Sequence, residues 1–462
     1  MPVNIKDALF RPRGVAIVGA SNDPAKLSGR PLDFLLRLGY QGHIVAVNPT
    51  RSVVQGVKAY PKLADAPGPI DLAIVVLPAA AVVQALRDCA AAGVAAAIVF
   101  ASGFSEMGGR GVPMQDEIDE IVKSTGLRVI GPNCLGTFAL PTKAFATFSS
   151  AFDEEIAMPD DAIALVSQSG AVGTFTFSTL VSAGVGVRYF ANTGNEVDVS
   201  MGELLAELAK VDDVDVLMGY LEDGRRLDKV EEAAAEADRR GKPLLLMKSG
   251  ATLEGRRAVG LHTGSQPGND ADFMAIVERH GAIRVESMEA AADAAILFRQ
   301  GRRAAGKRVV LVTSSGGASA LTTDAAVQMG LQVDPPSEAV REAIRPMLPE
   351  YGSTANPIDL TGALLTDEPL IKRVLTKLVD DPLVDIILVV LGNADRNGDA
   401  LVENIVSVCE TTNKPFVVAW SGGSGRPRLA LQAHHIPTYP DPLRAVKAIK
   451  RLVDFSLRQR KA

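Results

Sequence analysis

Short apolar runs, each followed within a few residues by small, polar or turn residues such as glycine, serine, asparagine or proline, recur along the chain and restrict its fold more than any other feature. The first five are Val15–Val18, His43–Val47, Leu72–Leu77, Ala97–Phe100 and Leu127–Ile130. Runs that are apolar at every position, rather than at alternate positions, are typical of strands buried on both faces of a parallel sheet. Helices cover both faces of such sheets, so we predict an α/β fold.

The same pattern continues to the end of the chain. A small basic stretch without apolar periodicity, Gly301–Lys307, interrupts it and is typical of a linker. For 462 residues we therefore predict three domains, 1–150, 151–300 and 301–462, in line with roughly 150 residues per domain. The remaining predicted elements are strands at Ala162–Val166, Gly186–Phe190, Val214–Tyr220, Leu244–Met247, Arg308–Val312, Ile386–Leu391 and Phe416–Trp420, helices at Pro31–Leu38 and Met288–Asp293, and a long loop at Tyr351–Leu360.

Composition excludes several classes of protein. A net charge of −6 argues against a nucleic-acid-binding protein. The three cysteines, Cys89, Cys134 and Cys409, are too scattered for a disulfide framework or a zinc site, so we expect a reducing cytoplasmic compartment and no metal site. The N-terminus lacks the pattern of a signal peptide, and no apolar run approaches the ~20 residues that span a bilayer.

The carboxyl ends of the first predicted strands carry small or turn residues, and open α/β sheets bind ligands at this edge. Gly19–Ser21 is a nucleotide-type turn but lacks the Gly-x-Gly-x-x-Gly pattern, and Asn48–Pro49 stands where an NAD site needs an acidic residue. Both features weaken a dehydrogenase interpretation, and no P-loop motif occurs. Lys26, Arg30 and Arg51 near this edge either meet phosphates or are simply solvated.

Two predicted helices start with small residues that suit an anion. Ser-Gln-Ser-Gly at 167–170 and Thr-Ser-Ser-Gly-Gly at 313–317 each follow a strand. Free backbone N–H groups and the helix dipole favour a phosphate at such a start, although plain N-capping by serine explains either motif alone.

His262 is the histidine most suited to chemistry among the five in the chain. It stands in Gly260–Ser265, which we predict to be a loop after the Leu244–Met247 strand, and a neutral imidazole is a competent nucleophile. Glu222, at a predicted strand end, can orient such an imidazole. A loop histidine without function and a solvated glutamate are the alternatives. We assign Cys134 a structural role, since no histidine is near it in sequence.

Several ordered segments together resemble one family, the NDP-forming acyl-CoA synthetases, which include succinyl-CoA synthetase. The resemblance covers essentially the whole chain and is greatest to the α subunit of the ADP-forming acetyl-CoA synthetase type. It implies an N-terminal Rossmann-like CoA-binding domain followed by two flavodoxin-like domains. The segments that carry it are Val18–Ser21, Val47–Pro49, Gly131–Gly136, Ser167–Ala171, His262–Ser265 and Asn356–Leu360.

The resemblance also implies roles for individual residues. His262 matches the transiently phosphorylated histidine, Glu222 the carboxylate that steadies it, and Ser169 with Gly170 the helix start that holds phosphate. Ser315 with Gly316 offers a second helix start for the same phosphate. The residues that fall at or beside CoA-site positions of the family are Gly19, Ala20, Ser21, Lys26, Asn48, Pro49, Pro78, Ser102, Gly103 and Asn133.

The family reaction converts an acid, CoA and NTP to acyl-CoA, NDP and phosphate through an acyl phosphate and a phosphohistidine. Its Mg-nucleotide, ADP or ATP, binds an ATP-grasp module. The third predicted domain takes up the sequence to Ala462 and leaves no length for such a module, so we expect this chain to need an ATP-grasp β subunit and to form an oligomer. The alternative is a non-catalytic CoA or acyl-CoA sensor, and a nicotinamide oxidoreductase is a weaker third hypothesis.

The chain departs from the family pattern around two of these motifs. Leu261 replaces a serine before the histidine, and Gln266–Gly268 replaces Leu-Ala-Gly after it. Thr50–Arg51 stands where lysine commonly follows Asn-Pro. These changes leave the histidine in place and bear on substrate range and rate.

Overall fold

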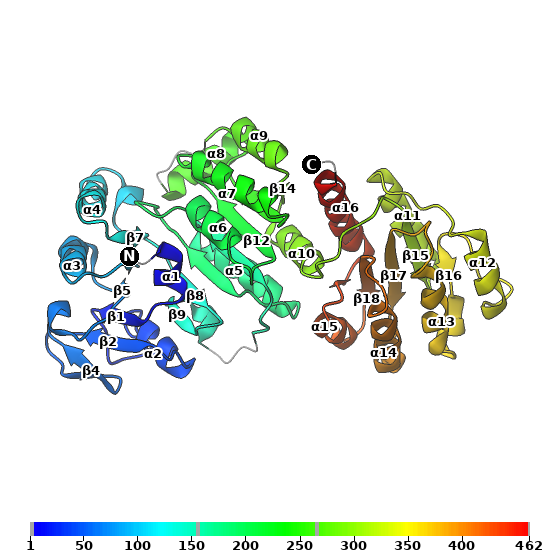
Figure 1. Ribbon diagram of the computed structural model, residues 1–462, viewed down its shortest axis with the longest axis horizontal. Coiled ribbons are helices and arrows are strands. Elements are labelled where there is room, and N and C mark those ends of the chain that lie inside the picture. Colours follow the sequence, from blue (N-terminus) through cyan, green and yellow to red (C-terminus); the bar gives the residue numbers. More distant parts are fainter. Residues whose placement is uncertain (1–3, 154–157, 264–267, 461–462) are drawn as a thin grey trace. The chain divides into compact units, whose positions relative to one another are not determined.

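The computed structural model describes residues 4–153, 158–263 and 268–460, without the side chains of residues 262 and 263. Three sheets of mainly parallel strands alternate with helices along the chain, which confirms the predicted α/β class (Figure 1). The chain divides into two structural units, Met1–Thr179 with Gly186–Met288 and Leu180–Val185 with Glu289–Ala462. The first unit contains two of the sheets and the second unit contains the third.

The first sheet has the strand order of a Rossmann fold. Its order is β3-β4-β2-β1-β5-β6-β7, in which every pair except β3–β4 is parallel. The order reverses between β1 and β5, which is the point where such sheets bind ligands. Its strands are β1 (Gly14–Val18), β2 (His43–Val47), β3 (Val53–Val54), β4 (Val57–Tyr60), β5 (Leu72–Val75), β6 (Ala96–Val99) and β7 (Arg128–Ile130), and its helices are α1 (Ile5–Phe10), α2 (Arg30–Arg37), α3 (Ala79–Ala91) and α4 (Gly111–Thr125).

The second sheet has a flavodoxin-like order with an added hairpin. Strands β11-β10-β12-β13-β14 are parallel neighbours, and the hairpin β8–β9 pairs antiparallel with β11 although it precedes residue 150. Residues 131–135 therefore lead directly from the carboxyl end of β7 into the second sheet. Its strands are β8 (Gly136–Ala139), β9 (Ala144–Thr147), β10 (Ile163–Ser167), β11 (Tyr189–Asn192), β12 (Val216–Leu221), β13 (Leu244–Lys248) and β14 (Ile283–Arg284), and its helices are α5 (Gly170–Ser182), α6 (Met201–Ala209), α7 (Leu227–Arg239), α8 (Leu253–Thr263) and α9 (Asp270–His280).

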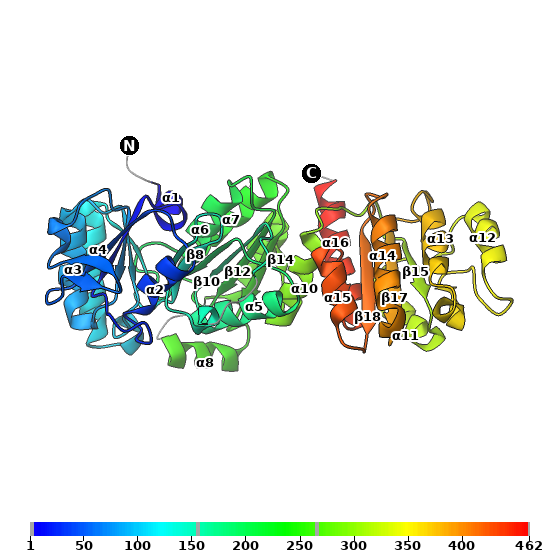
Figure 2. The same cartoon turned by 90° about the horizontal axis from the view of Figure 1, so that it is seen from below.

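A continuous hydrophobic core joins the two sheets of the first unit. Phe10 of α1 packs edge-on against Tyr189 of β11, with ring centroids 5.3 Å apart. Phe138 of β8 stacks on Phe145 and on Phe190, each at 5.3 Å. The apolar runs at the start of the chain thus supply both faces of one sheet and part of the packing of the next. Figure 2 shows α6 and α7 on one face of the second sheet and α5 on the other.

The third sheet, in the second unit, is entirely parallel. Its order β16-β15-β17-β18-β19 is again that of a flavodoxin-like sheet. The predicted loop at 351–360 contains the two-residue strand β16. The strands are β15 (Val309–Thr313), β16 (Ile358–Asp359), β17 (Ile386–Gly392), β18 (Phe416–Ser421) and β19 (Thr438–Tyr439), and the helices are α10 (Met288–Phe298), α11 (Gly316–Gln328), α12 (Glu338–Ile344), α13 (Pro369–Leu378), α14 (Gly398–Cys409), α15 (Arg426–Ala433) and α16 (Pro442–Gln459).

Six short 3₁₀ helices complete the described elements. They are η1 (Leu63–Asp65), η2 (Ser105–Met107), η3 (Ser150–Phe152), η4 (Arg345–Met347), η5 (Thr361–Leu365) and η6 (Asp395–Asn397). In the described ranges, no helix combines the length and the apolar character needed to cross a bilayer.

The prediction that His262 lies in a loop is wrong, because the backbone there is the last turn of α8. The hydroxyl of Thr252 accepts a hydrogen bond from the N–H of Gly255 at 3.0 Å and so caps the helix. Good helix formers between residues 253 and 261 outweigh Gly260, since an interior glycine costs only about 1 kcal/mol relative to alanine. The side chain of His262 lies outside the described part of the chain.

Candidate functional site

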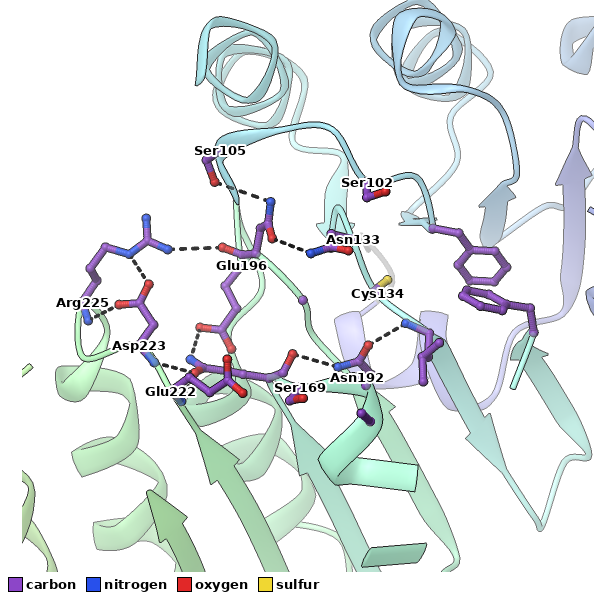
Figure 3. Close-up of a pocket in the computed structure, with 18 of the residues that line it drawn as sticks. Ser102, Ser105, Asn133, Cys134, Ser169, Asn192, Glu196, Glu222, Asp223 and Arg225 are labelled. Atoms are coloured by element: carbon purple, nitrogen blue, oxygen red, sulfur yellow. Dashed lines mark hydrogen bonds and ion pairs between the residues drawn. The ribbon is translucent and has the colours of Figure 1, made fainter. Parts of the chain in front are cut away.

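A pocket of about 370 Å³ lies in the first unit, between the carboxyl end of the second sheet and the segment that follows β7 (Figure 3). It brings together five residues to which the sequence assigned a binding or catalytic role, although they are distributed over 121 positions of the chain. These are Ser102, Asn133, Ser169, Gly170 and Glu222. Each follows a strand or starts a helix, so the pocket arises where carboxyl ends of parallel strands meet.

The start of α5 forms one side of this pocket. The hydroxyl of Ser169 lies 3.5 Å from the N–H of Val172, in the position of an N-cap. A Cβ atom on Gly170 would come within 2.6 Å of the Leu135 side chain and 3.2 Å of Asn192 Oδ1. Only glycine lets residues 131–135 approach the helix start this closely.

Two side-chain amides hold the base of the pocket. Asn192, at the end of β11, donates from Nδ2 to the carbonyl oxygens of Ser167 and Gln168, and its Oδ1 accepts the N–H of Leu135. The Gln168 side chain accepts the N–H of Glu222 at 2.6 Å. These bonds fix the strand-end segments relative to each other.

Glu222 is buried beside a tyrosine at the end of β12. The hydroxyl of Tyr220 donates to Glu222 Oε1 at 3.0 Å. Burial raises the pKa of Tyr220, so this tyrosine is a protonated donor at neutral pH. Asp223, next along the chain, pairs with Arg225, whose N–H donates to Asp223 Oδ1 at 2.8 Å. The wall formed by β12 and its following loop therefore carries two carboxylates and one guanidinium.

Glu196 adds a third carboxyl group to the pocket, and sequence analysis missed it. It is buried, and its backbone has a φ of 55°, a left-handed conformation that residues other than glycine seldom adopt. Its Oε1 accepts the N–H of Met201 at 2.7 Å and the Thr193 hydroxyl at 2.8 Å, and its Oε2 accepts from Gln168 at 3.0 Å. Burial raises the pKa of Glu196 even though these donors favour the carboxylate.

The loop after β6 closes the polar rim of the pocket. Asn195 donates to Glu106 and, at 3.1 Å, to Gln115, while Asn133 donates to Asn195 Oδ1 at 3.3 Å. Glu106 in turn accepts the N–H groups of Gly103 and Phe104. Ser102 and Ser105 line the pocket on this side, and Figure 3 shows both on the segment above Asn133 and Glu196.

The other end of the pocket is apolar. Phe100 and Phe148 pack edge to face with ring centroids 4.7 Å apart, and Leu27, Cys134 and Leu135 complete this end. Burial raises the pKa of Cys134 to about 12, so its thiol is protonated at neutral pH and is a poor nucleophile. The pocket thus offers polar partners to one end of a small ligand and an apolar wall to the other.

The predicted CoA residues at the ends of β1 and β2 form a second cluster in the same unit. The N–H of Gly19 donates to the Val47 carbonyl at 3.0 Å, and Asn48 Nδ2 donates to the Ala20 carbonyl at 2.9 Å. Gly19 has a φ of 93°, and a Cβ there would meet Leu77 at 2.7 Å. Such tight turns let a ligand approach the backbone. Ser21, Lys26 and Pro49 follow the same two strands in the chain, Pro78 precedes the start of α3 and Gly103 follows β6.

Ser315 and Gly316 lie in the second unit, at the start of α11. The hydroxyl of Ser315 lies 3.4 Å from the N–H of Ala318, which is the N-capping that sequence analysis left as the plainer explanation. A hollow of about 460 Å³, lined by Ser315 and by residues at the ends of β15, β17 and β18, adjoins this helix start. The position of Ser315 is compatible with anion binding but does not require it.

The pocket residues that sequence analysis left without a role share a recognisable position. Phe100, Asn195, Glu196 and Asp223 follow the ends of β6, β11 and β12, the same signal that identified Ser102 and Glu222. Gln168 stood inside a recognised motif, but its side chain had no assigned role. In the described residues, no cluster of three or more histidine, cysteine or acidic side chains is arranged to hold a metal ion.

Comparison with known proteins identifies the family. Models of a CoA binding domain, a succinyl-CoA ligase like flavodoxin domain and a Ligase-CoA domain match residues 13–139, 160–298 and 309–394. The chain is 32% identical over 458 residues to the acetate–CoA ligase (ADP-forming) II subunit alpha of Pyrococcus furiosus, and 30% identical over 466 residues to the I subunit alpha, with 97% of each chain covered. The structure of Ca. Korarchaeum cryptofilum dinucleotide forming acetyl-coenzyme A synthetase 1, in complex with phosphate and ADP, matches with a TM-score of 0.90 and 30% identity, covering 99% of this chain and 98% of the other. With this agreement over its full length, the chain belongs to the family of ADP-forming acetate–CoA ligase α subunits, within the NDP-forming acyl-CoA synthetases.

Proposed function

We propose that this chain is the CoA-binding, phosphohistidine-bearing α subunit of an ADP-forming acyl-CoA ligase. In the direction of synthesis, ATP phosphorylates His262 and releases ADP, the phosphoryl group passes to an acid to form an acyl phosphate, and the CoA thiol displaces phosphate. Each step transfers one group, and the sum is acid, CoA and ATP to acyl-CoA, ADP and phosphate. Two phosphoryl transfers replace one difficult condensation.

The observation that carries the proposal is the pocket itself. It places a capped helix start at Ser169, a buried carboxylate at Glu222 and an apolar wall at Phe100 around one cavity. A helix start favours a phosphoryl group, a carboxylate can hold an imidazole in one tautomer, and an apolar wall suits an acyl chain. The helix α8 that carries His262 contacts η2, which contributes Ser105 to the pocket rim.

CoA is proposed to bind the first sheet of the same unit. Gly19, Ala20, Ser21 and Asn48 form tight turns at the carboxyl ends of β1 and β2, where the pyrophosphate and adenosine of CoA can approach the backbone. Lys26, Pro49, Pro78, Ser102, Gly103 and Asn133 are the further CoA-site residues we propose. The last of these lines the pocket, so it would meet the thiol end of CoA.

The proposed activity requires a second subunit. The matched relatives of Pyrococcus furiosus are named as alpha subunits. We propose that an ATP-grasp β subunit binds the Mg-nucleotide and that the two chains form a cytoplasmic oligomer. The purified chain should bind CoA but should not make ATP from acyl-CoA, ADP and phosphate until the β subunit is added.

The decisive experiment is phosphorylation of His262→Ala in complex with the β subunit and Mg-ATP. The variant should incorporate no acid-labile, base-stable phosphate and should lose turnover, while its affinity for CoA stays within about twofold because the CoA site lies on the first sheet. His280→Ala, which removes the histidine at the end of α9 that pairs with Glu231 of α7, is the matched control. Acid-labile phosphate on the His262→Ala protein would assign the role to another residue.

Glu222→Gln tests the second residue of the proposed pair. Removal of the carboxylate should slow formation of the histidine phosphate by about 10–100-fold, the range typical of a group that orients a reacting imidazole. The Tyr220 hydroxyl can still donate to the amide oxygen, so the fold should remain. Rapid-quench measurement of phosphorylation checks this, and an unchanged rate would remove Glu222 from the mechanism.

A further inference from the structure

We propose that Gln168 is a positioning residue of the phosphoryl-transfer pocket, acting as a neutral bridge between Glu196 and the backbone at Glu222. The inference rests on the proposed function, since the step it affects is phosphoryl transfer at Glu222. Gln168 lies in the turn between β10 and α5, immediately before the capping residue Ser169.

The side-chain amide of Gln168 makes three hydrogen bonds to two other strand-end loops. Its Oε1 accepts the N–H of Glu222 at 2.6 Å and the N–H of Asp223 at 2.9 Å. Its Nε2 donates to Glu196 Oε2 at 3.0 Å. One side chain thus joins the loops after β10, β11 and β12, which Figure 3 shows converging at Ser169, Glu196 and Glu222.

The orientation of this amide follows from the chemistry of its partners. The two backbone N–H groups can only donate, so the atom that faces them must be the amide oxygen. The amide nitrogen then faces Glu196, and a donor must meet an acceptor there. Because Glu196 Oε1 already accepts from Met201 and Thr193, its Oε2 is the oxygen that remains for Gln168.

This bridge determines where the Glu222 carboxylate lies. Adjacent N–H groups in a turn are a common binding place for an anion, and here Gln168 Oε1 occupies them. The phosphoryl group is therefore left to the helix start at Ser169, while the main chain at Glu222 is held by a neutral acceptor. Loss of the bridge would free the backbone from which the Glu222 side chain extends.

We expect position 168 to need a neutral residue because acidic residues adjoin it. The carboxylate of Glu196 accepts its amide N–H, and its amide oxygen accepts the backbone N–H groups of Glu222 and Asp223, of which Asp223 is paired with Arg225. A carboxylate at 168 could still accept the two N–H groups but would oppose Glu196. An apolar side chain would leave two N–H groups without their acceptor, at about 1–3 kcal/mol each when buried.

Exchanging the amide of Gln168 with the carboxyl group of Glu196 tests the proposal in the complex with the β subunit. Gln168→Glu should lower the rate of phosphohistidine formation by at least about tenfold at pH 8, which corresponds to the loss of one charge-assisted hydrogen bond. Gln168→Glu combined with Glu196→Gln should restore the rate to within about threefold, since an amide at 196 keeps its oxygen toward Met201 and Thr193 and donates to the carboxylate at 168. The KM for CoA should change little in either protein.

The pH profile separates positioning from a general loss of structure. In Gln168→Glu, one proton shared between the carboxyl groups at 168 and 196 replaces the missing donor, so the rate should recover as the pH falls toward 6. Gln168→Met, which can neither accept nor share a proton, should be slow at every pH. Gln84→Glu is the matched control, because Gln84 donates to Asp88 on the exposed surface of α3 and should leave rate and profile unchanged.

The outcomes distinguish the positioning role of Gln168 from the proposed function of the whole chain. A wild-type rate and profile for Gln168→Glu, or failure of the folded double variant to recover, would overturn the positioning role. Should Gln168→Glu not fold, the double variant and Gln168→Met still provide the test. Absence of acid-labile phosphate on the wild-type complex would instead reject the proposed function itself, which the same assay detects first.

Discussion

At the scale of residues, neutral amides join the strand-end loops that form the pocket, and the one ion pair described there is that between Asp223 and Arg225. Asn192 and Gln168 bridge backbone groups from different strand ends, and Asn195 bridges Glu106 and Gln115. Amides both donate and accept, so they can join loops without adding charge near a phosphoryl group. The apolar end of the pocket depends instead on the contact between two rings.

Phe148→Ala should shift acid preference toward longer or aromatic acids. Phe148 packs on Phe100 at the apolar end of the pocket, and its removal leaves room where an acyl chain would extend. We expect the ratio of kcat/KM for an aromatic acid to that for acetate to rise by about 10-fold, which corresponds to roughly 1.4 kcal/mol of new apolar contact. Steady-state kinetics with both acids measure this ratio.

Phe175→Ala is the control for that change, because Phe175 is 57% exposed on α5 and does not line the pocket. It should leave the preference unchanged. An unaltered ratio in Phe148→Ala would mean that the acyl group does not reach the aromatic pair.

At the scale of elements, the first and third sheets use the same device where their central strands begin. Arg13 precedes β1 and holds Asp71 through its N–H, Nε and Nη2, while Arg308 precedes β15 and holds Asp385 in the same way. Each aspartate is buried just before a neighbouring parallel strand. The pair therefore fixes two strand starts on the side of the sheet opposite to the ligand-binding edge.

Asp385→Asn should lower the free energy of unfolding of the second unit by about 1–3 kcal/mol at neutral pH. Burial opposes ionisation of Asp385, but the hydrogen bonds from Arg308 prevail and lower its pKa. The stabilisation is therefore present above the unfolded pKa of roughly 3.9 and is lost as the pH falls through the lower folded pKa. The difference between wild type and variant should shrink below about pH 4, as denaturant unfolding at several pH values would show.

Asp119→Asn serves as the control, since Asp119 pairs with Lys123 on the exposed face of α4 and the change should stay within about 0.5 kcal/mol. A difference for Asp385→Asn that does not vary with pH would contradict the role of the ionised pair.

At the scale of the whole molecule, the first unit combines a Rossmann-type sheet and a flavodoxin-like sheet, each with its own ligand-binding edge. The first unit joins a Rossmann-type sheet to a flavodoxin-like sheet through residues 131–135, and a continuous core holds the two together. The second unit repeats the flavodoxin-like order without the hairpin. Ligand binding should consequently stabilise the units unequally.

CoA should raise the melting temperature of the first unit and slow amide exchange there. Ligand at 100 times its dissociation constant stabilises a folded protein by about 2.7 kcal/mol. Exchange should slow most at Gly19–Ser21 and near Asn133, whereas β17 in the second unit provides the internal control and should not change. Hydrogen exchange with millimolar CoA measures both, and equal protection of β17 would place the CoA site elsewhere.

Much of the fold and part of the site could be predicted from local sequence. The apolar runs at Val15–Val18 and Ile386–Leu391 are strands because full burial of a parallel strand requires apolar residues at every position. Residues that follow such runs, including Ser102 and Glu222, line the pocket because parallel strands end at one edge. The helix at His262 was missed because two glycines outweighed the helix formers in that interpretation.

Sequence by itself determined the α/β class, most strands and the family, since each depends on patterns within a few neighbouring residues. Only the tertiary structure decided that the hairpin β8–β9 extends the second sheet, and that Gln168 bridges Glu196 and Glu222. Glu196 and Glu222 lie 28 and 54 positions after Gln168 in the chain. Contacts across such distances depend on how loops from different strands converge, and local propensity carries no information about that convergence.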